Sequence, residues 1–180
     1  MVINFGLGGL RLTSAEAGVE FDLDGDGIPE RLGWTRAGED VAFLVHGAVV
    51  QNGRQLFGNL SPQAPRIEGE SENGYRALRL HDFNGDLAID ARDPIWSELS
   101  LWFDWNHNGI SEVSEIRTLG ERGLVSISLD YVETGKQDGY GNLHRQRARV
   151  RLSDGSWRWS TDFYPIPLRE YSRVAEVVKP

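Results

Sequence analysis

Short stretches in which apolar and polar residues alternate recur along the chain, and this pattern predicts β-strands. Two of them, residues 2–5 and 18–21, lie near the N-terminus and are separated by a polar turn. Residues 124–131 alternate in the same way. The run over residues 41–50 is apolar at nearly every position, which predicts a buried strand or a hairpin around Gly47.

The clearest strand pair lies at residues 145–163, where a turn over residues 153–156 joins two alternating stretches. The return strand carries Trp157 and Trp159. The arginine face of the first strand has two interpretations: it is a patch that binds an anion or a polysaccharide, supported by the tryptophans, or an outer face whose arginines pair with acidic groups. The first strand directs Gln146, Ala148, Val150 and Leu152 to one side and Arg145, Arg147, Arg149 and Arg151 to the other.

Helical signals are fewer and shorter. Residues 75–80 suit a short helix. Pro94 is placed to start a second one, because proline is favoured in the first helical turn. Residues 116–120 are interpreted as the end of a third helix.

Composition narrows the classes of function. The chain has 27 acidic and 19 basic residues and a net charge of −8, which argues against nucleic acid as the main partner. It has no cysteine, so disulfides and thiolate metal sites are excluded. No apolar run approaches the roughly 18 residues of a membrane-spanning helix, and the first residues lack the basic segment of a signal peptide.

The strongest chemical motif lies over residues 104–115, which match the calcium-loop pattern D-x-[DN]-x-[DN]-G-x5-E at every specified position. Ca²⁺ takes about six to eight oxygen ligands, so the loop must curl around the ion. Gly109 at position six permits the sharp turn, and Ile110 at position seven is expected to point inward. The alternative is an Asn/Gly-rich turn without a metal. The candidate ligands are Asp104, Asn106, Asn108, the Ile110 carbonyl, Glu112 and Glu115.

An earlier stretch repeats the first half of this pattern. Three carboxylates at alternate positions repel one another unless a cation lies between them, although a solvated acidic turn remains the alternative. Position twelve is Gly33, so a further ligand must come from elsewhere, with Glu39 and Asp40 as reserves. The candidate ligands are Asp22, Asp24, Asp26, the Ile28 carbonyl and Glu30.

A third stretch has ligand types at positions one, three, five, nine and twelve. Its departure is Leu87 at position six, where a branched side chain makes the required positive φ costly. Asp93 at position twelve is shorter than glutamate and is expected to bind through one oxygen. The candidate ligands are Asp82, Asn84, Asp86, the Ala88 carbonyl, Asp90 and Asp93.

These elements together predict an α+β fold in which short helices surround paired EF-hand-like calcium loops, with a β-sheet that includes the C-terminal hairpin. The loops at 82 and 104 are expected to brace each other across the helix that follows Pro94. We expect one calcium-binding domain over residues 1–180, with a core over 1–135 and the hairpin and tail over 136–180.

The order of these motifs resembles a bacterial family over about residues 15–135: the calcium-binding self-processing module of RTX (repeat-in-toxin) proteins and related secreted EF-hand-like proteins. Besides the acidic loops, the resemblance is carried by Gly33-Trp34, Leu56-Phe57-Gly58, Ile116-Arg-Thr-Leu119 and Ser126-Ile-Ser-Leu129. It implies a secreted or cell-surface bacterial protein. It also implies a calcium-folded α/β module that cleaves an Asp–Pro bond immediately before itself, through an anhydride formed by the aspartate, and can join the freed aspartyl group to a lysine of another protein.

The chain departs from the family pattern in two loops and at the cleavage site. Residues 4–9 and 46–54 stand where the family has acidic loops, and they carry no carboxylates. The sequence contains one Asp–Pro bond, Asp93–Pro94, and its aspartate is a candidate calcium ligand that is poorly placed to attack its own carbonyl.

Three functions follow. The first is a non-catalytic extracellular module that is stabilised by about three Ca²⁺ ions. The second is Asp–Pro self-processing or transpeptidation, and the third is a surface that binds a glycan or another anion. Calcium is the expected cofactor, and an extracellular protein or glycan is the expected macromolecular partner.

Overall fold

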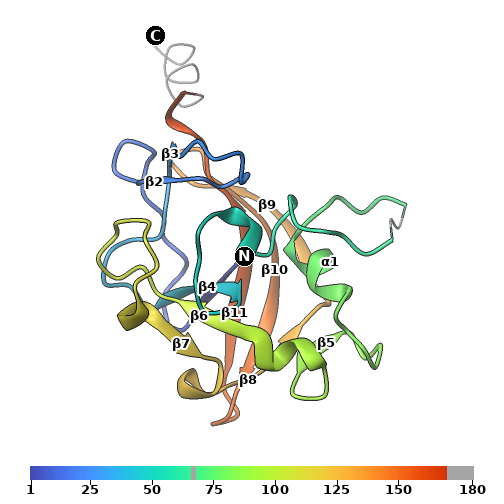
Figure 1. The fold of residues 1–180 in the computed structure, drawn as a ribbon. Helices are drawn as coiled ribbons and strands as arrows, with labels where there is room; N and C mark the ends of the chain where they lie inside the picture. Colours follow the sequence, from blue (N-terminus) through green and yellow to red (C-terminus); the bar gives the residue numbers. More distant parts are fainter. Residues whose placement is uncertain (66–67, 170–180) are drawn as a thin grey trace.

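Most of the chain lies in short β-strands, which form a curled nine-stranded sheet and a separate two-stranded sheet (Figure 1). The computed structural model describes residues 1–65 and 68–169. In chain order the strands are β1 (Val2–Asn4), β2 (Val19–Phe21), β3 (Glu30–Leu32), β4 (Val41–His46), β5 (Ala88–Asp90), β6 (Leu99–Trp102), β7 (Ile116–Thr118), β8 (Leu124–Ser128), β9 (Val132–Gln137), β10 (Leu143–Leu152) and β11 (Trp157–Tyr164).

The large sheet has the order β5-β8-β10-β11-β1-β4-β6-β7, and β9 pairs with the other part of β10. Its pairings are antiparallel. Strand β1 lies between β11 and β4, so the first residues of the chain and the C-terminal hairpin are neighbours in the middle of the sheet. Strands β2 and β3 form the small sheet, with the acidic loop at 22 between them.

Both faces of the large sheet are buried in its central part, and two hydrophobic clusters cover them. In β4, Ala42 and Leu44 contribute to one cluster, whereas Val41, Phe43 and Val45 contribute to the other. Successive strand residues point to opposite faces, so a strand that is buried on both sides is apolar at every position. This explains the continuous apolar run and confirms the predicted buried strand.

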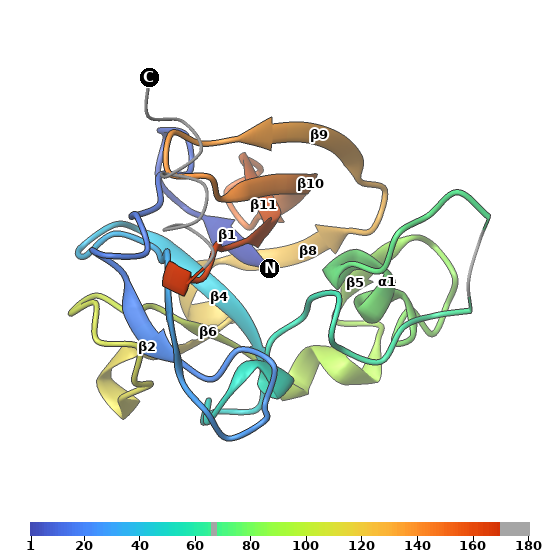
Figure 2. The same ribbon diagram turned by 90° about the horizontal axis from the view of Figure 1, so that it is seen from above.

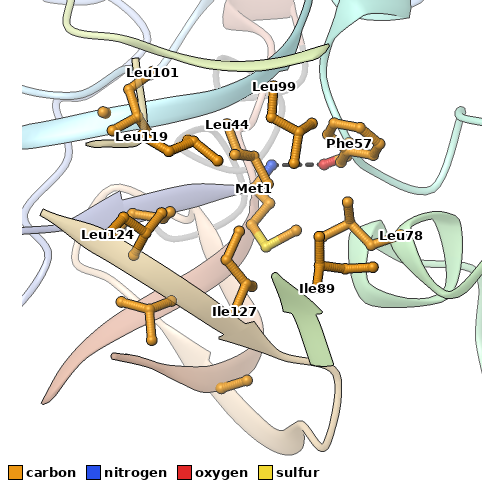
Figure 3. Packing of buried hydrophobic residues seen from close by; sticks show 14 of the residues in the cluster. Met1, Leu44, Phe57, Leu78, Ile89, Leu99, Leu101, Leu119, Leu124 and Ile127 are labelled. Carbon is orange, nitrogen blue, oxygen red and sulfur yellow. Dashed lines mark hydrogen bonds between the residues drawn. The ribbon is translucent and has the colours of Figure 1, made fainter. Parts of the chain in front are cut away.

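Figure 3 shows the first cluster, in which side chains from strands β4, β6 and β8 meet those of α1 and the 56–58 segment. The nitrogen of Met1 lies inside this region and donates a hydrogen bond to the carbonyl of Phe57 at 2.7 Å. The second cluster is aromatic: the rings of Phe21, Trp34, Phe43 and Trp102 are packed against one another. Each fully buried apolar side chain contributes about 1.5–3 kcal/mol to folding.

The expected α+β class is wrong, because helices are short and rare in the described part of the chain. Helix α1 (Gly74–Arg79) confirms the helix predicted at 75–80. Residues 116–118, predicted as helix, form strand β7 against β6. A short apolar segment gives too little periodicity to separate helix from strand, and isolated helices this short are marginal. The 3₁₀ helices are Gly53–Gln55, Pro94–Glu98, Val113–Glu115 and Gly120–Arg122.

The predicted C-terminal hairpin is confirmed except at Arg145, which lies at a β-bulge between His144 and Gln146 and stacks on Tyr164 instead of joining the other arginines. Strands β10 and β11 pair with Arg149 opposite Trp159 and Arg151 opposite Trp157. Gln146, Ala148 and Val150 are buried on the inner face. Strand β9 pairs with the first half of β10, and the tail over residues 170–180 lies outside the described part of the chain. No helix among the described residues has the length and apolar character to cross a membrane.

Candidate metal sites

The three acidic loops share one backbone path. In each loop, the residues at positions four and six have positive φ, a backbone conformation that residues other than glycine rarely adopt. Leu87 takes this conformation in spite of its branched side chain. In the described part of the chain, the non-glycine residues with positive φ are Leu87 and His107, and both lie in these loops. The φ angles are 74° and 90° at Gly25 and Gly27, 71° and 61° at Gly85 and Leu87, and 61° and 74° at His107 and Gly109.

The first carboxylate of each loop accepts hydrogen bonds from backbone N–H groups further along the loop. Asp22 accepts from Gly25 at 2.8 Å and from Gly27 at 3.0 Å. Asp82 and Asp104 make the equivalent bonds to the residue at position six, both at 2.9 Å. The loop therefore curls back on its first side chain and directs its oxygen atoms toward a common centre.

The loop at 22 brings three carboxylates together. One oxygen atom each from Asp22, Asp24 and Asp26 lies within 4.8 Å of the others, an arrangement that can hold a metal ion. Glu30 at position nine faces Arg169, with 2.5 Å between the guanidinium and the carboxylate. The reserve candidates are engaged elsewhere, because Glu39 pairs with Arg11 and Asp40 pairs with Arg122.

The turn at 52–55 supports this loop from the outside. The N–H of Gly53 donates to the carbonyl of Asp22 at 2.8 Å, and the Arg54 guanidinium donates to the carbonyl of Gly25 at 3.0 Å. The approach is so close that a Cβ on Gly53 would lie 1.7 Å from the Leu23 carbonyl oxygen. The path of the acidic loop thus depends on a contact with a segment far away in the sequence.

The loop at 82 is closed by a buried carboxylate and partly neutralised by an arginine. Asp93 accepts hydrogen bonds from Phe83 N–H at 2.9 Å and from Asp90 N–H at 3.0 Å. The exposed Arg92 pairs with both Asp86 and Asp90, and it lowers the pKa of Asp90. A metal ion at this loop would compete with the Arg92 guanidinium for these two carboxylates.

The loop at 104 is tied to the aromatic cluster through two indole groups. Trp34 donates to an oxygen of Asp104 at 2.8 Å, and both residues are buried. Trp102 donates to an oxygen of Glu115 at 3.3 Å. His107 lies with its two ring nitrogens 2.7 Å from the carbonyls of Thr35 and Ala17. The first and last carboxylates of this loop are therefore positioned by the core.

Two carboxylates of this loop meet without an intervening donor, which provides a test of whether a metal fits. The Oε2 atom of Glu112 is buried and has no hydrogen-bond partner among the described residues. Burial raises the pKa of Glu115, and the adjacent Glu112 raises it further. The Asn108 amide lowers the pKa of Glu112. Two carboxylates in contact conflict when both are ionised, unless a cation neutralises them, so the all-oxygen donor set fits a hard cation.

Other details of the predicted sites are wrong. Ile110, at position seven, is expected to point inward, but its side chain is 63% exposed. The loops at 82 and 104 do not form a pair: strand β5 of the first pairs with β8, whereas Gly109 of the second packs on Val19 and Glu20. Figure 2 places β5 beside α1, on the side of the molecule opposite β2.

Sequence reasoning missed the groups that hold these loops. Position four lacks a motif signal because Gly25, Gly85 and His107 share only their backbone conformation. Trp34 had a signal, since a buried indole needs an acceptor for its N–H. The supporting contact of Gly53 arises from tertiary structure and leaves no local pattern.

Comparison with known proteins agrees with this arrangement of motifs. The family model described as the SPM domain matches residues 1–164, a range that includes the C-terminal hairpin. The chain is similar to the iron-regulated protein FrpA of Neisseria meningitidis serogroup C, with 36% identity over 143 residues. This match covers 78% of the chain and 13% of the relative, so the chain spans a small part of that protein.

Proposed function

The chain belongs to the SPM domain family, and on that premise we propose that it is a module whose three acidic loops bind Ca²⁺ and whose folded state depends on those ions. The sites comprise the ligands identified from the sequence at 22–30, 82–93 and 104–115. Ca²⁺ would supply positive charge at the centre of each loop. The side-chain and carbonyl oxygens of the loop would coordinate the ion and so hold the loop in its curled conformation.

The shared backbone path is the observation that carries this proposal. A side chain at positive φ costs roughly 1–2 kcal/mol, and such strain persists only where the surroundings require it. Leu87 and His107 accept that cost at the same two loop positions at which glycine stands in the other loops. The position-twelve carboxylates, Asp93 and Glu115, are both buried, and a nearby cation would offset the cost of burying their charge.

Calcium would contribute a large fraction of the stability. Extracellular calcium modules have dissociation constants of about 10⁻⁴–10⁻³ M. At a tenfold excess of free calcium each independent site contributes about 1.4 kcal/mol, or about 4 kcal/mol for three. A domain's whole stability is about 5–15 kcal/mol. The folded module would therefore be less stable at cytoplasmic calcium levels than outside the cell, as expected for part of a secreted or cell-surface bacterial protein.

Cleavage at Asp93–Pro94 has no support in the geometry. Both carboxylate oxygens of Asp93 accept backbone hydrogen bonds inside the loop. Attack on its own carbonyl would require the side chain to leave these donors and the proposed calcium ion. The proposed role is thus a calcium-stabilised module that does not cleave this bond.

The test is a thermal melt in millimolar calcium and in EDTA, with a magnesium control. We expect a calcium-specific rise in Tm. Asp104→Ala should reduce Tm in calcium more than in EDTA, because it removes a calcium ligand, whereas the loss of the acceptor of the Trp34 N–H lowers Tm in both conditions. Asp130→Asn, which changes one exposed carboxylate outside the loops, is the matched control. Equal melts in calcium and EDTA would overturn the proposal.

A further inference from the structure

The outer face of β10 carries a row of arginines that have no carboxylate partner. Arg147, Arg149 and Arg151 form no ion pair with any described residue, although the chain has 27 acidic side chains. Arg145 does not continue this row, because a β-bulge between His144 and Gln146 leaves it over the ring of Tyr164. The predicted alternative, in which acidic groups cover this face, is therefore wrong for the described part of the chain. Like charges at neighbouring outward positions repel one another, so this face carries an unbalanced positive charge on an acidic protein.

Aromatic rings accompany these arginines instead. Arg147 lies 4.3 Å from the ring centre of Trp159, and Arg149 lies 5.6 Å from the same ring. Arg149 is also 6.0 Å from the ring of Trp157. The tryptophans remain 41% and 51% exposed, so they present free ring surface beside the guanidinium groups. The register of β10 and β11 produces this alternation, because Arg149 pairs with Trp159 and Arg151 with Trp157.

A cavity of about 290 Å³ opens at the Arg147 end of the row. Its wall includes Asn4, Lys136, Asp138, His144, Arg147 and Trp159, and the Asp138 carboxylate lies 3.8 Å from Nε2 of His144. The buried Nε of Arg147 and Nε2 of His144 have no hydrogen-bond partner among the described residues. A buried polar atom without a partner costs free energy, so the cavity offers unused polar atoms as well as charge and an aromatic surface.

We propose that this face binds an acidic polysaccharide. One sugar unit lies against Trp159 in the cavity, its anionic group accepts hydrogen bonds from Arg147 and Lys136, and further units extend past Arg149 and Arg151. Guanidinium groups form strong paired hydrogen bonds with carboxylate, sulfate or phosphate oxygens. Outward residues of a strand repeat about every 6.6–6.8 Å, which provides a linear array for a linear polyanion.

The lining of the cavity favours a sugar over other polyanions. The half-exposed ring of Trp159 lines the cavity beside Arg147 and can stack on the apolar face of a sugar ring. The Asn4 and Thr134 side chains are hydrogen-bonded within the protein. The net charge of −8 opposes the dense phosphates of a nucleic acid. The binding face lies on the hairpin, separate from the three acidic loops. This proposal therefore goes beyond calcium binding, and it can be wrong even if the loops bind calcium.

The experiment is a titration of the calcium-loaded protein with hyaluronate oligosaccharides, followed by tryptophan fluorescence and by calorimetry. Neutral dextran, oligo-dT and phosphatidylglycerol vesicles serve as comparison ligands. We expect binding to hyaluronate but not to dextran, and weaker binding to the other two. Arg147→Gln and Trp159→Ala should each weaken hyaluronate binding about tenfold or more, with calcium-dependent melts retained.

Arg117→Gln is the matched control, because Arg117 also lies over a tryptophan, 5.1 Å from the Trp105 ring, but on strand β7. It should bind hyaluronate as tightly as the unmodified protein. The absence of hyaluronate binding, equal binding to oligo-dT or to the vesicles, or equal losses in Arg117→Gln and Arg147→Gln would each overturn the proposal. If Trp159→Ala does not fold, Arg147→Gln alone decides the outcome.

Discussion

The hydrogen bond between Trp34 and Asp104 should couple the aromatic cluster to the loop at 104, and Trp34→Phe tests this coupling. The substitution keeps a ring in contact with Phe21 and Phe43 but removes the N–H that donates to Asp104 at 2.8 Å. A hydrogen bond to a charged group contributes about 1.5–3 kcal/mol. The smaller ring costs about 1–2 kcal/mol in lost packing.

The total loss is therefore about 3–5 kcal/mol, equivalent to a fall in Tm of about 6–20 °C for a domain of this size. Denaturant unfolding in excess calcium should measure it for Trp34→Phe, Asp104→Ala and the double variant. Because the two residues share one buried bond, we expect a coupling energy of about 1.5–3 kcal/mol.

Asp82→Ala is the matched control for this cycle. Asp82 holds the same first position in its loop as Asp104, but its loop joins α1 to β5, which lie on the side of the molecule opposite β2 (Figure 2). Its effect should add to that of Trp34→Phe within about 0.5 kcal/mol. A coupling between Trp34 and Asp104 that is no larger than this control value would refute the claim that the core positions the loop.

Three further predictions concern other contacts. Gly53→Ala should destabilise the protein by about 1–3 kcal/mol and weaken the loop at 22, because its Cβ would meet the Leu23 carbonyl. Denaturant unfolding should measure this loss, and it should show nearly unchanged stability for Gly58→Ala, where the added Cβ has open space around it. The Asp93–Pro94 bond should stay intact during long incubation in millimolar calcium, so two fragments on a denaturing gel that Asp93→Asn abolishes would contradict the proposed role. Burial lowers the pKa of His144 below the unperturbed 6.5. The unfolded state therefore binds the proton more readily, and stability falls as the pH drops below about 6.5. Between pH 7.5 and pH 5.5 in excess calcium, Tm should fall less for His144→Gln than for the unmodified protein or for His46→Gln.

The sequence predicted the loops because their geometry is encoded locally. The carboxylate at position one and its partners at positions three and five lie within a few residues of one another in the sequence. Gly27 and Gly109 indicate the turn at position six. The same local logic identified the hairpin, where strict alternation and a turn signal agree.

The arrangement of the loops could not be predicted, because strand pairing is a long-range property. Nothing local in residues 2–4 indicates that β1 lies between β4 and β11. The expected mutual support of the loops at 82 and 104 came from their closeness in sequence. Strand β5 instead pairs with β8, more than thirty residues further along the chain.

The two stretches that lack carboxylates at the expected loop positions are closed by uncharged amides. Asn4 closes the first with its own amide, which accepts from Gly6 N–H at 2.9 Å and donates to the Gly8 carbonyl at 2.8 Å. In the second, Asn52 and Gln55 exchange side-chain and backbone hydrogen bonds. Uncharged amides can both donate and accept, so these turns close without an ion. An ionised carboxylate can only accept, so carboxylates that lie close together, such as Asp22, Asp24 and Asp26, repel one another where amides would not. This difference is the physical reason for proposing calcium at the acidic loops.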